Sequence, residues 1–182
     1  MSDLPIVHDD FVNPVLTFFR EAFQTCPDPR FLYVPDSLDT KISIQGMDAF
    51  NLELVEKKPG ITVEREDISW KNFSLDRLSG ATSTGEWTYL DHQEGRLVCH
   101  CYAKTSLVSS HLASLVFHLI RASRLELRQQ GGFFEIDSVN ISRTTRYRGK
   151  DSSEPEFRST AVTVRAVLPW SITQRKETGV TP

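Results

Sequence analysis

The residue types best suited to chemistry in this chain form a triplet, Cys99-His100-Cys101. Thiolate and imidazole groups are common zinc ligands, and a cysteine beside a histidine can also act as a nucleophile with its base. The surrounding residues 97–104 alternate as in a β-strand, which directs the two cysteines to one face and His100 to the other. The three side chains therefore cannot converge on one ion, and we expect the cysteines to be small core residues beneath a helix.

Two histidines, His111 and His118, are seven residues apart on a predicted helix and could in principle present a pair of imidazoles. No carboxylate or His-x-x-x-His spacing accompanies them, so we interpret them as boundary residues beside the core. The serines lack a Gly-x-Ser-x-Gly elbow, and the glycines form no phosphate-binding loop. We therefore expect no catalytic residue, no metal ion and no cofactor. The alternative, a Cys/His enzyme, would need His100 and one of the cysteines in a single pocket.

Arginines on the same predicted helix suggest contacts with a partner. Arg121, Arg124 and Arg128 fall on its polar face, and Phe117 lies with them. One interpretation is a solvated face with an isolated aromatic residue. The other is a subunit or partner interface, for which an aromatic residue among arginines is a typical composition. We carry these four residues forward as candidate interface residues.

A second basic cluster lies at the start of residues 144–156, which are predicted to be a long hairpin loop. Its members are Arg143, Arg146, Arg148 and Lys150, and Tyr147 lies among them. They could contact DNA phosphates or an acidic partner, and Tyr147 could stack on bases in a β-sheet nucleic-acid-binding module. Three acidic residues follow within the same loop, so a salt-bridged loop is an alternative of equal standing.

Length and composition indicate one ordinary water-soluble domain. The 182 residues are 39% hydrophobic, 10% aromatic and 25% charged, a balance that excludes disorder for most of the chain. A formal net charge of -3 gives no global attraction to nucleic acid or an anionic membrane. Three cysteines are too few for a disulfide framework and fit a reducing compartment. We expect neither a signal peptide in residues 1–10 nor a membrane span.

The N-terminal half is predicted to contain one docked helix and one clear strand. The helix covers residues 14–24, starts at Asn13 and Pro14, and has three phenylalanines on its buried face. Residues 28–58 are interpreted as a loop-rich insertion with one or two short strands. The strand, residues 61–70, is interrupted by a charged segment that indicates a bulge or an exposed edge.

The C-terminal half reads as a β-α-β-β unit. A polar turn at residues 91–95 leads into the strand at 97–104, and a helix over residues 107–128 follows, capped by Thr105 or Ser106. Extended patterns at residues 134–141 and 158–168 complete the unit. We therefore predict an α+β fold with a mixed, mainly antiparallel sheet flanked by two helices. It would form a single domain over residues 1–173, with a flexible tail at residues 174–182.

In order and spacing, this organisation resembles the tail terminator proteins of long-tailed bacteriophages. The matching segments are the Phe-rich helix at residues 14–24, Pro-Gly-Ile-Thr-Val at 59–63, Gly-Arg-Leu-Val-Cys-His-Cys-Tyr-Ala-Lys-Thr at 95–105, the helix at 107–128, and the strands at 136–143 and 161–168. About two-thirds of the chain is covered. Residues 28–58 have no clear counterpart, and the loop at 144–156 is long. Both differences suit either a particular neck or a related head-completion, tube or sheath-attachment component.

The resemblance implies a structural virion protein of the tail and neck region, made in the host cytoplasm. Such a protein would form a homohexameric ring around a DNA channel, with non-specific contact with the DNA. Its partners would be other copies of itself, the tail tube protein and the head-proximal neck or connector protein, with no membrane involved. The resemblance implies no catalytic residue.

Overall fold

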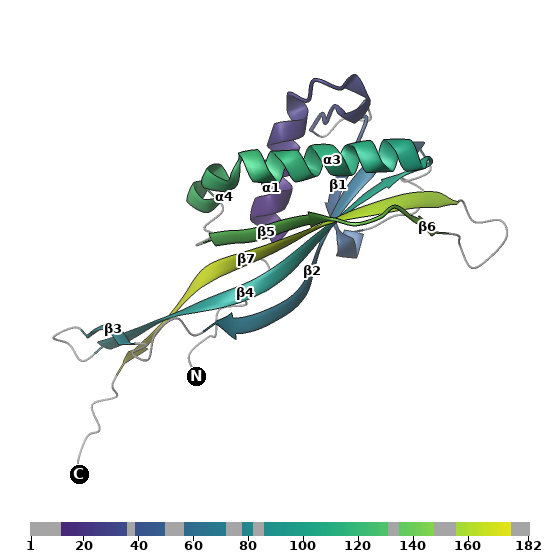
Figure 1. Ribbon diagram of the computed structural model, residues 1–182. Coiled ribbons are helices and arrows are strands. Elements are labelled where there is room, and N and C mark those ends of the chain that lie inside the picture. The colour runs from purple at the N-terminus through teal and green to yellow at the C-terminus, as the bar shows by residue number, and fades with distance from the viewer. Residues whose placement is uncertain are drawn as a thin grey trace, which may run out of the picture.

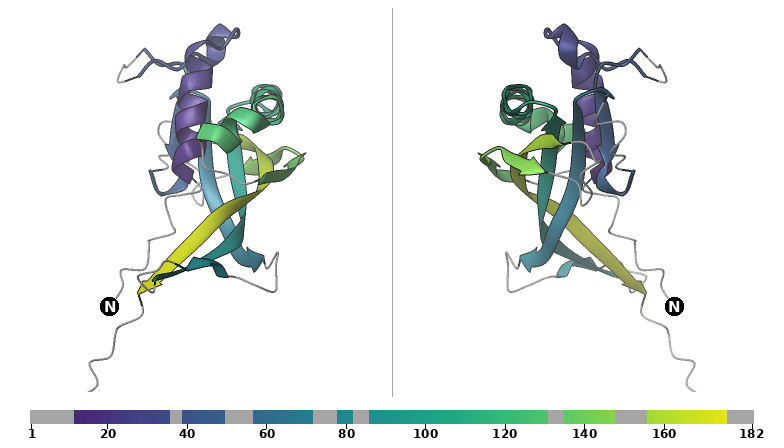
Figure 2. Two further views of the ribbon diagram at one scale, coloured as in Figure 1. Left: turned by 90° about the vertical axis from the view of Figure 1, so that its left-hand side faces the viewer. Right: turned by 90° about the vertical axis from the view of Figure 1, so that its right-hand side faces the viewer.

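The computed structural model of the chain describes residues 12–35, 39–49, 57–71, 78–81, 86–130, 135–147 and 156–175. Within these ranges one mixed sheet carries helices on one of its faces, as Figures 1 and 2 show. The strands are β1 (Ser43–Gly46), β2 (Gly60–Lys71), β3 (Leu78–Ala81), β4 (Glu86–Ala103), β5 (Glu135–Ile141), β6 (Thr145–Tyr147) and β7 (Phe157–Arg175). The predicted α+β class is confirmed.

The strand order is β1-β2-β4-β7-β5, with β3 paired to β4 and β6 paired to β7. Only the pairing of β1 with β2 is parallel among the described strands; the other pairs are antiparallel. The long strand β4 lies between β2 and β7, so its backbone groups are paired along both edges. Strand β4 is therefore central in the sheet.

The helices are α1 (Val12–Gln24), α3 (Ser106–Ala122) and α4 (Arg124–Gln130), with two 3-10 turns, η1 (Pro29–Phe31) and η2 (Met47–Ala49). Helix α1 packs on β1 and β2, while α3 packs on β4, β7 and β5. The two helices therefore share one face of the sheet and divide it between them (Figure 2).

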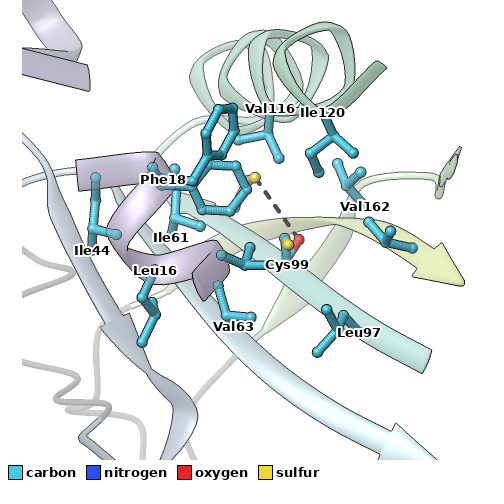
Figure 3. Packing of buried hydrophobic residues seen from close by; sticks show 14 of the residues in the cluster. Leu16, Phe18, Ile44, Ile61, Val63, Leu97, Cys99, Val116, Ile120 and Val162 are labelled. Carbon is cyan, nitrogen blue, oxygen red and sulfur yellow. Dashed lines mark hydrogen bonds between the residues drawn. The ribbon is translucent and has the colours of Figure 1, made fainter. Parts of the chain in front are cut away.

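The core lies between this helix layer and the sheet. Phe19 and Phe23 of α1 are fully buried, and so are Leu112 and Val116 of α3. On the sheet they meet the inward residues Ile61, Val63, Leu97, Cys99, Cys101, Val162 and Val164, several of which are labelled in Figure 3. These strand residues occupy alternate positions, as one face of a sheet requires. The predicted buried face of α1 is confirmed.

Two corrections concern element ends. The predicted polar turn at residues 91–95 is wrong, because β4 continues through it, paired with β2 on one side and β7 on the other. Polar side chains favoured a turn, but backbone pairing along both edges outweighs that local preference. The predicted single helix at 107–128 is likewise wrong, since it is broken at Ser123 and continues as α4. Only one residue leaves the helical path, so the apolar periodicity runs across the break undisturbed.

Other local predictions are confirmed. Thr105 caps α3, accepting a hydrogen bond from the Val108 amide. The charged interruption of the strand after residue 60 is a bulge, where the register with β4 shifts between Arg65 and Ile68. The segment 28–58 contributes one short strand, β1, within its described part.

The predicted start of the flexible tail at residue 174 is wrong, because β7 continues to Arg175 and pairs there with β4. Residues 36–38, 50–56 and 176–182 lie outside the described residues, so the rest of the insertion and of the tail stay predictions.

The sheet extends well beyond the helix layer. Residues 86–93 of β4 pair with residues 168–175 of β7 and with β3. We call this part of the sheet the ribbon; in Figure 1 it projects to the lower left, and none of the labelled helices lies over it. An 18-residue strand spans about 60 Å when extended, whereas the 17 residues of α3 span about 25 Å.

Candidate functional site

The Cys-His-Cys triplet does not form a reactive site. Cys99 and Cys101 are completely buried under the helices, and burial raises the pKa of Cys99 to about 12 and that of Cys101 well above its usual value. His100 lies on the opposite face, where its ring stacks on Tyr102 and its Nε2 is 3.3 Å from Glu64. The predicted split between the two faces is confirmed. No three His, Cys, Asp or Glu side chains are placed to bind a metal among the described residues.

The two helix histidines also do not act together. The ring of His111 stacks on Phe31 with centroids 5.8 Å apart, and its Nε2 is 3.4 Å from an oxygen of Asp28. His118 instead packs edge-on against Phe117. Each histidine thus has its own local partner. Both side chains are exposed at the border of the core, so the predicted boundary positions are confirmed.

Phe117, Arg121 and Arg124 of the helix patch make contacts within the subunit that the sequence pattern did not indicate. Phe117 is half-buried and packs against the core, and the guanidinium of Arg121 lies 5.5 Å from the centre of its ring. Arg124 starts α4 and donates a hydrogen bond to the Asp137 carbonyl at 3.5 Å. Arg128 is exposed. The assignment of these residues to an interface stays a prediction.

The basic cluster after β5 divides into paired and unpaired side chains. Arg146 forms an ion pair with Glu156, which also binds Arg158 at 2.7 Å, so the predicted salt bridging is present in part. The predicted loop at 144–156 is wrong at residues 145–147, which form β6 and pair with β7. Arg143 is exposed and has no ion-pair or hydrogen-bond partner for its side chain among the described residues. Arg148 lies outside the described residues. We call residues 141–147, where β5 passes into β6, the β5–β6 corner.

Tyr147 belongs to an aromatic cluster that the sequence did not reveal. Its ring stacks on Phe157 at 5.2 Å with an interplanar angle of 6°, and Phe157 packs edge-on against Tyr102. The Thr62 hydroxyl donates to the Tyr102 hydroxyl at 2.9 Å. Burial raises the pKa of Tyr102 to about 12. The cluster lies on the sheet face opposite the helices, and only the pairing of β4, β7 and β6 brings it together.

A groove between α1 and α4 also went unnoticed in the sequence. Its volume is about 310 Å³, and Pro14, Phe18 and Leu127 supply its apolar part. Glu21 and Glu126 are the charged residues that line it. We call it the α1–α4 groove. Sequence periodicity could not find it, because its residues come from α1 and α4, which are distant in the chain and meet only when the two helices pack together.

Comparisons of the sequence with known proteins identify no relative of this chain. No protein-family model matches the chain, and none of the curated proteins matches its sequence. Among the described residues, no helix combines the length and apolar character that a bilayer span requires.

Proposed function

We propose that this chain is a structural subunit of a long-tailed bacteriophage, a tail terminator that forms a ring, caps the tail tube and joins the tail to the head or neck. The ring would be a homohexamer, as the resemblance in segment order implies. Its mechanism would be geometric: one ring face binds the last tube ring, and the other binds the neck and stops tube growth.

The ribbon is the observation that carries this proposal. Isolated ribbons of two or three strands are marginally stable in water unless another layer packs on them. In the described chain, the ribbon extends past the helices that cover the rest of the sheet. A subunit inside a ring, or one docked on a tube, could supply the missing layer.

The placement of the reactive residues agrees with a structural role. The thiols are buried and their pKa values are raised, while His100 is on the other side of the sheet. A Cys/His enzyme would need these groups in one pocket, and the two faces of β4 hold them apart. The proposal therefore assigns no catalytic residue to the chain.

Two alternative functions require different binding surfaces. A related neck component, such as a head-completion or sheath-attachment protein, would use the same ribbon with a different partner. A nucleic-acid-binding module would need free basic residues and an open aromatic face. Its case is weaker, because Glu156 pairs with Arg146 of the basic cluster and Tyr147 already stacks on Phe157.

Assembly with the tail tube protein of the same phage tests the proposal. The purified chain is mixed with polymerising tube protein, and the products are imaged by electron microscopy. We expect ring-shaped caps at one end of the tubes and shorter tubes as the chain is added. Tube protein from an unrelated phage is the control. The proposal fails if the chain binds neither tube nor neck protein over a range of salt and pH.

Binding to single-stranded DNA separates the nucleic-acid alternative. Fluorescence anisotropy at low and moderate salt should give weak binding or none. Tight binding that falls steeply with salt, and that is lost in Arg143→Ala, would favour the nucleic-acid-binding module instead.

A further inference from the structure

The α1–α4 groove has the chemistry to bind a basic side chain. Phe18 and Leu127, which line it, are buried residues with little exposed surface of their own. Glu21 and Glu126 also line the groove, and no basic residue lines it in the described chain. A guanidinium could bind both carboxylates, while its methylene stem packs on the apolar side chains.

The neighbouring arginines do not neutralise the groove. Arg121 is held over the ring of Phe117, and Arg124 donates to a carbonyl of β5. Arg128 is two residues from Glu126, a rotation of about 200° around a helix, so it lies on the opposite side of α4. Among the described residues, no basic side chain neutralises Glu21 and Glu126 in the groove.

The β5–β6 corner has the complementary character. Arg143 is exposed and unpaired within the described chain, and Ile141 and Tyr147 are each 45% exposed beside it. The corner thus combines a free guanidinium with two apolar surfaces.

These two surfaces lie at opposite ends of one subunit. In Figure 1, α4 is at the left end of α3, and β6 is at its right end. The 17 residues of α3 separate the ends by about 25 Å. The groove and the corner of one molecule therefore cannot reach each other, but those of two molecules can.

We infer that the α1–α4 groove of one subunit binds the β5–β6 corner of a second copy of this chain, with Arg143 between Glu21 and Glu126. This contact is head-to-tail, because it leaves one free groove and one free corner at the two ends of each dimer. Such contacts continue from subunit to subunit until they close into a ring. The inference rests on the proposed function for the ring, and it names the faces on which neighbouring subunits meet.

Charge exchange tests the contact. Wild-type protein, Glu126→Arg and Arg143→Glu are studied by sedimentation velocity over a range of concentrations. Each variant alone should associate at least about tenfold more weakly than the wild type. An equimolar mixture of the two variants should recover association, because each copy then supplies the surface that its neighbour needs. Both positions are exposed, and circular dichroism verifies that the variants remain folded.

A matched control separates the contact from net charge. Glu135→Arg makes the same charge change at an exposed glutamate of β5 outside the groove, and it should associate like the wild type. Three results would overturn the inference: wild-type protein that stays monomeric at its highest soluble concentration, single variants that associate normally, or a mixture that does not recover association.

The test of this contact and the test of the proposed function can have different outcomes. If the wild-type chain caps tail tubes and both variants cap them equally well, the proposed function is supported and the proposed contact is excluded. If the chain self-associates through the groove but binds neither tube nor neck protein, the contact is supported and the proposed function is excluded.

Discussion

The hydroxyl of Ser109 on α3 donates a hydrogen bond to the carbonyl oxygen of Cys101 on β4, at 2.9 Å. A hydroxyl has one proton, so Thr160, 2.8 Å from Ser109, must donate to it. Thr144, 2.8 Å from Thr160, must in turn donate to that hydroxyl. A directed chain of hydroxyls thus links the β5–β6 corner to the helix and to two central strands.

Removal of the Ser109 hydroxyl should destabilise the protein. Ser109→Ala removes two buried hydrogen bonds, to the Cys101 carbonyl and to the Thr160 hydroxyl, which together should cost about 1–3 kcal/mol. Ser110→Ala is the matched control, because its side chain is exposed on the same helix and should change stability by no more than about 0.5 kcal/mol. Urea unfolding measures both. Equal midpoints for the two variants would contradict the buried network.

The three thiols should differ in reactivity. Cys99 and Cys101 are fully buried with raised pKa values, whereas Cys26 is only partly buried. Because the thiolate is the reactive form, native protein should react with Ellman's reagent at one thiol, and protein unfolded in guanidinium at three. Cys26→Ser should remove the native signal. Rapid native labelling of Cys99 or Cys101 would contradict the core position and reopen the enzyme alternative.

Asp28 should make stability depend on pH in the acid range. The Arg30 side chain hydrogen-bonds to the carboxylate, at 2.6 Å for Nη2, and holds the pKa of Asp28 at about 2. Since the folded pKa lies below the unfolded value of about 3.9, the stabilisation is complete above that value and is lost as the pH falls through about 2.

The variant Asp28→Asn isolates this contribution. It should be less stable than wild type at pH 5, and the difference should shrink as the pH approaches 2, because protonation then removes the same charge from the wild type. Thermal unfolding at several pH values measures the difference. Asp48→Asn, at an exposed position of η2, should show no comparable change. A difference for Asp28→Asn that stays constant down to pH 2 would exclude the ion pair as its cause.

The ribbon should open more readily than the rest of the sheet. Helix α3 covers β4 near Cys99 and Cys101, but the ribbon residues 86–93 of β4 lie beyond the helices. Local opening costs less where fewer groups are packed, so hydrogen–deuterium exchange should be faster at residues 86–93 than at residues 97–103 in the free protein. On assembly with tube protein, exchange in the ribbon should slow. Equal protection of the two segments in the free chain would show that the ribbon needs no partner layer.

Periodicity predicted those parts of the fold whose side chains repeat with the backbone. Alternation around Cys99 correctly assigned the two faces of β4, and the phenylalanines of α1 correctly marked its buried side. The N-cap at Thr105 was predictable because it depends on neighbours in the chain. The interface assignment of Phe117 depended on exposure, which no local pattern fixes, and that side chain packs on the core.

The sequence by itself thus determined the fold class, the positions of the main helices and strands, and the separation of the thiols from His100. Only the tertiary structure decided the length of the ribbon, the break at Ser123, the aromatic cluster around Tyr102 and the α1–α4 groove. The physical reason is the range of the interactions. Hydrophobic periodicity and helix capping act between residues a few positions apart. Strand pairing and grooves join residues such as Pro14 and Leu127, which are distant in the chain and meet only when the elements pack.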